Sequence, residues 1–140
     1  MILGIGTDLC AIDRIERNLQ RFSQRFITRL FLPDERILCE RNPTLRAGRY
    51  AMFFAAKEAA AKALGTGLWR RQIGWHSIEI KRLESGGAEL KFHGSAWQIL
   101  QQRCPGRYHA YTSLSLTREA GFAMAIVMLW AGEPTAPSNR

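Results

Sequence analysis

The segment from Phe54 to Gly67 places the strongest constraint on the fold, because it is built mainly from alanine. Alanine is the best helix former, so the segment predicts a helix, and Gly65 offers the left-handed conformation that commonly ends one. Glu58 and Lys62 are four residues apart and share one face of that helix. Taken alone, such a pair is typical of a solvent-exposed helix and contributes only roughly a few tenths of a kcal/mol.

The amino terminus supplies a second candidate carboxylate. Ile2 to Ile5 form a short apolar run that meets Gly6 and then Asp8. This pattern predicts a strand that ends in a turn at Gly6. It places Asp8 at the end of that strand, where functional side chains are commonly held.

Length and composition indicate an ordinary globular protein. The 140 residues suit one domain, and 46% hydrophobic with 23% charged residues argues against a disordered or fibrous chain. The net charge of +8 favours an anionic partner: nucleic acid, a phosphate-rich cofactor or an acidic protein. The longest apolar run, Phe122 to Trp130, is too short to cross a bilayer, and the start lacks a basic signal region. We therefore expect a cytoplasmic protein.

A helix with two distinct faces is predicted to begin near Ala11 or Ile12. The apolar residues that recur at helical spacing and would face the core are Ile12, Ile15, Leu19 and Phe22. The basic residues that recur on the outside are Arg14, Arg17, Arg21 and Arg25, here called the basic stripe. Asp13 and Glu16 are the only acids in this stretch. The basic stripe is thus either a solvated face or a docking face for an acidic partner.

Two more helices are predicted before Gly65. A proline followed by two acids at positions 33–35 is typical of a helix start, and this helix would end near Glu40. Asn42 is a typical N-cap for a long helix that runs from Pro43 to Leu64, about 33 Å at 1.5 Å per residue. A helix of that length should be central to the fold.

The second half of the chain predicts most of the strands. The predicted elements are a hairpin of Ile78–Leu83 and Ala88–Phe92, a helix from Gly94 to about Arg103, and strands over Tyr108–Leu116 and Phe122–Trp130. The fold class is therefore α+β, with a small antiparallel sheet packed against the long helix in a single domain of residues 1–131. Residues 132–140 show no apolar pattern, and we expect them to be a disordered tail.

Together, the segments Gly4–Asp8 and Phe54–Gly67 resemble the motifs of the holo-acyl-carrier-protein synthase family of phosphopantetheinyl transferases. The resemblance continues through Trp75–Ile80, the Ser-Gly-Gly turn and the final apolar strand. It implies an enzyme that moves phosphopantetheine from coenzyme A to a serine of an apo acyl carrier protein. It also implies a homotrimer with clefts at the subunit boundaries. Whether the carrier protein serves fatty acid biosynthesis or a specialised pathway stays open.

The resemblance assigns three catalytic residues. Asp8 and Glu58 match the metal ligands of the family, and magnesium commonly takes one or two carboxylates together with phosphates and water. Lys62 would neutralise charge that develops on the phosphoryl oxygens. A water held by the metal and Glu58 is one candidate for the base that takes the serine proton, but the identity of the base stays open.

The resemblance also implies a set of coenzyme contacts. The candidates are Arg46, Arg49, Phe54, Lys57, Lys62, Gly65, Thr66 and His109. Gly65 and Thr66 match the family's backbone contact to the nucleotide. Arg46 suits a phosphate on the ribose, and Lys57 is a second candidate for charge neutralisation beside Lys62.

The chain departs from the family pattern at two places. Phe53 stands where many members have an arginine, and Arg49, one helical turn earlier, is the candidate replacement. The late strand lacks the usual histidines, and either Tyr111 or Ser113 matches the first of them. His109 shares a strand face with both, so it either recovers the lost contact or is a surface residue.

Three functions compete on these observations. In the transferase, the basic stripe would dock the acidic carrier protein beside the coenzyme cleft. A nucleic-acid-binding module would explain the positive charge, but the aromatic residues lie at apolar periodic positions and not between the basic residues. A homologue that binds coenzyme A or a carrier protein without transferring the group would explain the departures at Phe53 and in the late strand.

Overall fold

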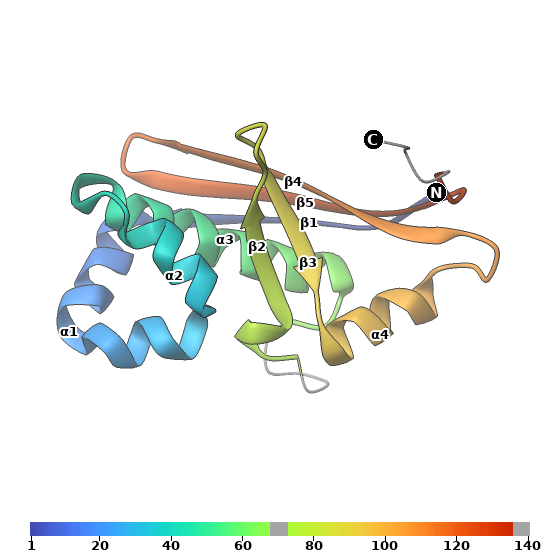
Figure 1. The fold of residues 1–140 in the computed structure, drawn as a ribbon, viewed down its shortest axis with the longest axis horizontal. Helices are drawn as coiled ribbons and strands as arrows, with labels where there is room; N and C mark the ends of the chain where they lie inside the picture. Colours follow the sequence, from blue (N-terminus) through green and yellow to red (C-terminus); the bar gives the residue numbers. More distant parts are fainter. Residues whose placement is uncertain (68–72, 136–140) are drawn as a thin grey trace.

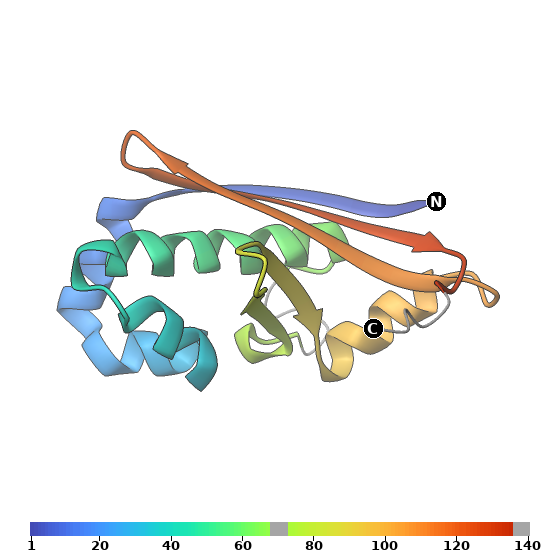
Figure 2. The ribbon, with the colours of Figure 1, turned by 45° about the horizontal axis from the view of Figure 1, so that its top comes forward.

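The protein is described here by a computed structural model that covers residues 1–67 and 73–135. It is an α+β domain in which the helix α3 (Arg46–Leu64) lies between two layers (Figures 1 and 2). A three-stranded sheet covers one side of α3, and the smaller helices with a two-stranded hairpin cover the other. The predicted fold class, a small antiparallel sheet on a long central helix, is confirmed.

The larger sheet is antiparallel throughout, in the order β1-β5-β4. Its strands are β1 (Ile2–Ala11), β5 (Phe122–Gly132) and β4 (His109–Glu119). The second, two-stranded sheet consists of β2 (Ile78–Arg82) and β3 (Ala88–Phe92), which form the predicted hairpin. It lies across α3 on the side opposite the larger sheet (Figure 2).

The prediction that β1 ends in a turn at Gly6 is wrong. β1 continues to Ala11, and Asp8 pairs with Ala125 inside the strand instead of lying at its end. The glycines serve close packing. A Cβ atom on Gly4 would lie 2.1 Å from the Ala63 carbonyl oxygen, and one on Gly6 would lie 1.9 Å from that of Ala59. Any side chain at these positions would push β1 away from α3.

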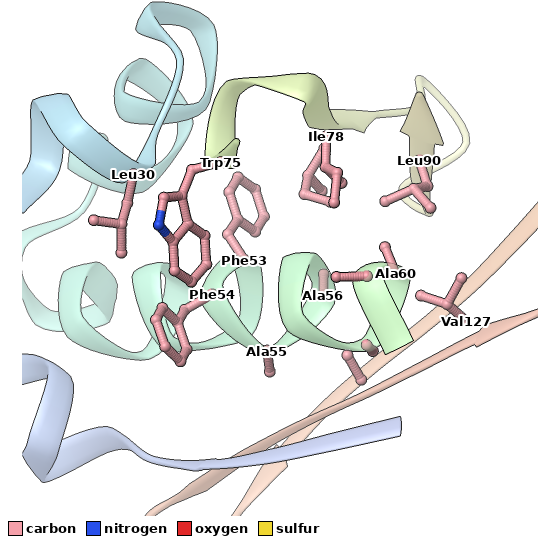
Figure 3. Close-up of a cluster of buried hydrophobic side chains, with 14 of the residues drawn as sticks. Leu30, Phe53, Phe54, Ala55, Ala56, Ala60, Trp75, Ile78, Leu90 and Val127 are labelled. Atoms are coloured by element: carbon pink, nitrogen blue, oxygen red, sulfur yellow. The ribbon is translucent and has the colours of Figure 1, made fainter. Parts of the chain in front are cut away.

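The central helix agrees with its prediction except in its first turn. Residues Pro43–Leu45 form a short 3-10 turn, η1, whose N-cap Asn42 accepts a hydrogen bond from the Thr44 amide at 3.0 Å. The α-helix then ends at Gly65, which has the predicted left-handed conformation with φ of 72°. Six alanines of α3 are fully buried: Ala51, Ala55, Ala56, Ala59, Ala60 and Ala61. Figure 3 shows Ala55 directed toward the larger sheet, whereas Ala56 and Ala60 face the hairpin side.

The amino-terminal helix is kinked, which the periodicity did not predict. α1 (Ile12–Leu30) contains a non-helical residue, Ser23, with φ of 44° and ψ of −122°. Ile15 and Leu19 are buried as expected, but Phe22, immediately before the kink, is 45% exposed, so its predicted core position is wrong. Because helical spacing breaks at Ser23, Arg25 no longer continues the row formed by the other arginines of the basic stripe.

The remaining elements lie close to their predicted bounds. They are α2 (Pro33–Glu40), the 3-10 turn η2 (Trp75–Ser77) and α4 (Gly94–Arg103).

After β5, the Tyr111 hydroxyl donates a hydrogen bond to the Glu133 carbonyl and accepts one from the Thr135 amide. Residues 136–140 of the predicted tail lie outside the described residues. Within the described part of the chain, no helix has the length and apolar character to cross a membrane.

The contact between β1 and α3 predicts a specific sensitivity at Gly6. Gly6→Ala should destabilise the protein by about 2 kcal/mol or more, because the new methyl group meets helix backbone that cannot move aside. Denaturant-induced unfolding measures the loss. Gly106→Ala is the matched control, since a Cβ atom there meets no atom within 4 Å. Equal stability of the two variants would contradict this account of Gly6.

Candidate active site

Three predicted catalytic residues meet where β1 passes α3. Lys62 Nζ lies 3.0 Å from Asp8 Oδ1 and donates a second hydrogen bond, also of 3.0 Å, to the Thr7 carbonyl. The Asp8 side chain is mostly covered, with 16% exposed, whereas the Lys62 side chain is 54% exposed. The ion pair therefore sits at the surface end of the contact between β1 and α3, where a substrate can reach it.

Glu58 lies one helical turn before Lys62 and completes this group. Partial burial raises the pKa of Glu58, and the Asp8 carboxylate raises it further, whereas Lys62 and Arg14 oppose the shift. Because Glu58 shares a face of α3 with Lys62, which binds Asp8, the two carboxylates lie on the same side of the helix. A site with two neighbouring, partly desolvated carboxylates favours the approach of a cation.

The pair Asp8 and Glu58 fits a magnesium ion. Magnesium accepts one or two carboxylates and completes its shell with water and substrate phosphates. Within residues 1–67 and 73–135, no group of three or more acidic, histidine or cysteine side chains forms a metal cage. The remaining ligands of a magnesium ion held by Asp8 and Glu58 would thus be water or the phosphate oxygens of a substrate.

Phe54 and Arg14 connect the catalytic group to α1. Phe54 is buried and stacks on Trp75, with ring centroids 5.2 Å apart and an interplanar angle of 28° (Figure 3). The Arg14 guanidinium lies 5.6 Å from the centroid of the Phe54 ring. One end of the basic stripe therefore lies beside the catalytic group, because Arg14 also acts electrostatically on Glu58.

The Gly65–Thr66 turn lies at the end of α3, just after Lys62. The Gly65 amide donates to the Lys62 carbonyl at 2.9 Å, and the Thr66 amide donates to the Ala61 carbonyl at 3.3 Å. These N–H groups are therefore directed back into the helix. Thr66 is buried, and its hydroxyl has no hydrogen-bond partner among the described residues. The turn therefore does not direct the amides of Gly65 and Thr66 toward a ligand.

Arg103 also binds this end of α3, a contact that the sequence analysis did not predict. Its Nη1 atom donates to the carbonyls of Ala63 and Leu64, at 3.1 and 2.9 Å, and its Nη2 atom donates to the Leu3 carbonyl. A lone arginine at the end of a predicted helix is common. Only the packing of α4 against α3 and β1 reveals these contacts.

Lys57 lies away from the catalytic group, in the core. Its side chain is fully buried, and Nζ donates to Glu35 Oε1 at 2.7 Å and to the Trp75 carbonyl at 2.9 Å. Burial lowers the pKa of Lys57, and the Glu35 carboxylate opposes that shift. This geometry gives Lys57 a structural role. Its predicted contact with a coenzyme stays a prediction that the placement does not favour.

Glu35 is the second buried charge, and the sequence analysis treated it only as part of a helix start. Oε1 accepts the Leu32 amide at 2.7 Å in addition to Lys57, and Oε2 accepts the Ile80 amide at 2.9 Å. The carboxylate thus joins the start of α2 to α3 and to the edge of β2. Buried charges need such a set of partners to compensate for lost hydration.

Arg49, a predicted coenzyme contact near the start of α3, lies on the opposite side of the helix from Glu58. Arg49 precedes Glu58 by nine residues, which at about 100° per residue places the two side chains on opposite faces. Arg49 donates to the Leu38 carbonyl at 3.1 Å, and Arg46 pairs with Glu40 at 2.7 Å. His109 is exposed at the start of β4. The structure therefore does not bring Arg49 and Glu58 together within one chain.

A cavity of about 360 Å³ opens on the Arg49 side of α3, between the hairpin and β4. Its lining combines apolar side chains with cations, and the residues that matter here are Arg49, Phe53, Lys81, Arg82 and Ser115. Phe53, which replaces the family's arginine, forms part of the wall. Three cations around one cavity favour an anionic ligand group.

Comparison with known proteins finds phosphopantetheinyl transferases both among family models and among individual relatives. The model of the 4'-phosphopantetheinyl transferase superfamily matches residues 4–127. A holo-[acyl-carrier-protein] synthase of Methylorubrum extorquens is 46% identical over 138 residues, which cover 99% of this chain and 100% of that protein. One from Cereibacter sphaeroides is 44% identical over 137 residues, with 98% of each chain covered.

Solved structures show the same similarity. The holo-[acyl-carrier-protein] synthase of Neisseria meningitidis superposes with a TM-score of 0.80 at 32% identity and covers 93% of this chain and 99% of that one. The Helicobacter pylori enzyme in complex with coenzyme A superposes with a TM-score of 0.75 at 28% identity and covers 90% and 99% of the two chains.

The burial of Lys57 predicts a loss of stability when its charge is removed. Lys57→Met should destabilise the protein by about 3 to 5 kcal/mol, because Glu35 then stays buried without its cation. Chemical denaturation measures this loss. Lys81→Met is the matched control, since Lys81 is 45% exposed and 3.8 Å from Glu79, and its stability should hardly change. A stable Lys57→Met protein that binds coenzyme A weakly would instead support the sequence-based role.

Proposed function

The chain belongs to the 4'-phosphopantetheinyl transferase superfamily, and on that premise we propose that it transfers phosphopantetheine from coenzyme A to a serine of an apo acyl carrier protein. The observation that carries the proposal is the meeting of Lys62, Asp8 and Glu58 at the contact between β1 and α3. Relatives that share nearly the whole chain are named holo-[acyl-carrier-protein] synthase, and one related structure holds coenzyme A.

The proposed reaction needs negative charge to be neutralised at phosphorus. The serine oxygen forms a bond to the phosphorus nearer the pantetheine, the bond to adenosine bisphosphate breaks, and the serine proton is released. Asp8 and Glu58 would hold magnesium, which polarises phosphoryl oxygens when bound. The Lys62 ammonium, exposed at the surface end of the site, would stabilise the charge that grows on those oxygens.

We further propose that each complete site requires two copies of the chain. The Arg49 cavity and the catalytic group lie on opposite sides of α3, so one copy cannot offer both to the same coenzyme molecule. The outer face of the larger sheet supports assembly, because it leaves apolar side chains exposed: Ile5 at 60%, Leu9 at 64% and Ile126 at 45%. A homotrimer, as the family resemblance implies, would cover such a face and supply a second copy at every site.

The basic stripe is the proposed docking surface for the carrier protein. All four of its arginines are exposed, and Arg14 lies beside the catalytic group through its contact with Phe54. An acidic carrier protein bound along the first half of α1 would therefore place its serine near Lys62. Arg25, beyond the kink at Ser23, would contribute less to this row.

The catalytic assignment predicts the loss of transfer in three variants. Asp8→Asn and Glu58→Gln should abolish magnesium-dependent labelling of an apo carrier protein by a fluorescent coenzyme A, because each removes charge at nearly constant shape. Lys62→Ala should slow turnover by about a hundredfold or more. Circular dichroism and thermal unfolding should show intact folds. Near-normal activity of either carboxylate variant would exclude the metal assignment, and a Lys62→Ala variant with only lower thermal stability would leave Lys62 a surface partner of Asp8.

The two-copy site predicts rescue between inactive variants. Asp8→Asn and Arg49→Glu should each inactivate the enzyme alone, but mixed trimers purified with two different tags should regain roughly one third of the wild-type rate, since one intact boundary remains per cyclic trimer. Mixtures of Asp8→Asn with Glu58→Gln are the matched control and should stay inactive, because both changes affect the same half of the site. Purified mixed trimers of the first kind without activity would contradict the two-copy site.

The docking surface predicts a selective change in carrier-protein kinetics. Arg14→Glu and Arg21→Glu should raise KM for the carrier protein and weaken its dependence on salt, with little change in KM for coenzyme A. Arg25→Glu should have a smaller effect, because the kink takes it out of the row. If charge reversal affected only binding to DNA or RNA, the nucleic-acid function would be favoured over docking.

A further inference from the structure

Arg103 joins the two elements that carry the catalytic group. Its guanidinium donates to the carbonyls of Ala63 and Leu64 at the end of α3 and to the Leu3 carbonyl on β1. Asp8 lies on that strand, and Lys62 lies just before those helix carbonyls. One side chain from α4, an element that supplies none of the predicted site residues, therefore holds both halves of the catalytic group.

The charge of Arg103 matters because of where a polyanion would have to bind. The last carbonyls of a helix lack partners within the helix and carry partial negative charge, so an anion is disfavoured beside them. The amides of Gly65 and Thr66 cover the carbonyls of Lys62 and Ala61, and Arg103 covers the carbonyls of Ala63 and Leu64. Arg103 Nη1 would lie 3.9 Å from a Cβ atom placed on Gly65, so a guanidinium cation stands directly over this turn.

We propose that Arg103 is a positioning residue that makes the carboxyl end of α3 accept the phosphates of the coenzyme. It binds the helix carbonyls, adds a permanent positive charge beside the Gly65–Thr66 turn, and ties that turn to β1. The inference rests on the proposed function, because it assumes that coenzyme A binds at this turn.

Arg107 provides a matched control on the same part of the chain. Among the described residues, its recorded contacts are with its neighbour Tyr108: Nη2 donates to the hydroxyl at 2.8 Å, and the guanidinium lies 4.8 Å from the ring centroid. Arg103 and Arg107 thus carry the same charge, four residues apart. Of the two, among the described residues, Arg103 is the one that hydrogen-bonds to α3 and β1.

The test compares loss of charge with loss of geometry. Arg103→Gln removes the cation, whereas Arg103→Lys keeps a cation but cannot reproduce a planar fork on three carbonyls. Arg103→Gln should raise KM for coenzyme A, and its Kd measured by calorimetry, by about tenfold, with kcat changed less than about twofold, because it removes a cation that binds the carbonyls at a helix end. Arg103→Lys should raise KM and Kd for coenzyme A by less than about threefold. The Gln and Lys variants should nevertheless lose similar thermal stability. Arg107→Gln should match the wild type.

Two results would overturn the proposal. One is an unchanged affinity for coenzyme A in Arg103→Gln. The other is an equal loss of affinity in Arg103→Lys and Arg103→Gln, which would mean that the shape of the guanidinium matters and its positive charge does not. If the proposed function is wrong, the result is different, because the wild-type protein itself would not transfer phosphopantetheine to the carrier protein. Direct coenzyme binding still tests Arg103 in that case, and a wild-type protein that does not bind coenzyme A would overturn both.

Discussion

The close contact between β1 and α3 is the constraint on which the site depends. Gly4 and Gly6 bring the strand against the helix backbone at Ala63 and Ala59, at distances that no side chain would allow. Because the strand and the helix touch so closely, Asp8 comes within hydrogen-bond reach of a lysine that is 54 residues away in the chain. The glycines and alanines are thus as necessary to the catalytic group as its charged residues.

Two lysines on α3 show how position decides the role of a charge. Lys57 and Lys62 each pair with a carboxylate, at 2.7 and 3.0 Å. The first pair is fully enclosed, and it connects α2, α3 and β2 through the several hydrogen bonds of Glu35. The second leaves its lysine open to solvent, where it can meet a substrate. A buried charge whose hydrogen bonds are satisfied is suited to specifying a fold, whereas an exposed charge is free to act on a ligand.

The same helix also separates the predicted coenzyme contacts. Arg49 faces a cavity beside the hairpin, and Glu58 lies on the opposite face of α3. A small domain with one long central helix can hold only half of a large ligand's contacts on each side. This separation, together with the exposed apolar face of the larger sheet, supports the proposed two-copy site.

Local sequence determined the elements of this protein, and contacts between distant segments decided how they are used. Alanine content and glycine placement were sufficient for α3 and its end at Gly65, because helix propensity and turn geometry are properties of neighbouring residues. The motif pair also predicted the candidate catalytic residues Asp8, Glu58 and Lys62. Three features could not be predicted in this way: the kink at Ser23, the buried partner of Lys57, and the hydrogen bonds of Arg103 to α3 and β1. Each depends on which surfaces pack together, and a one-dimensional pattern does not contain those distances.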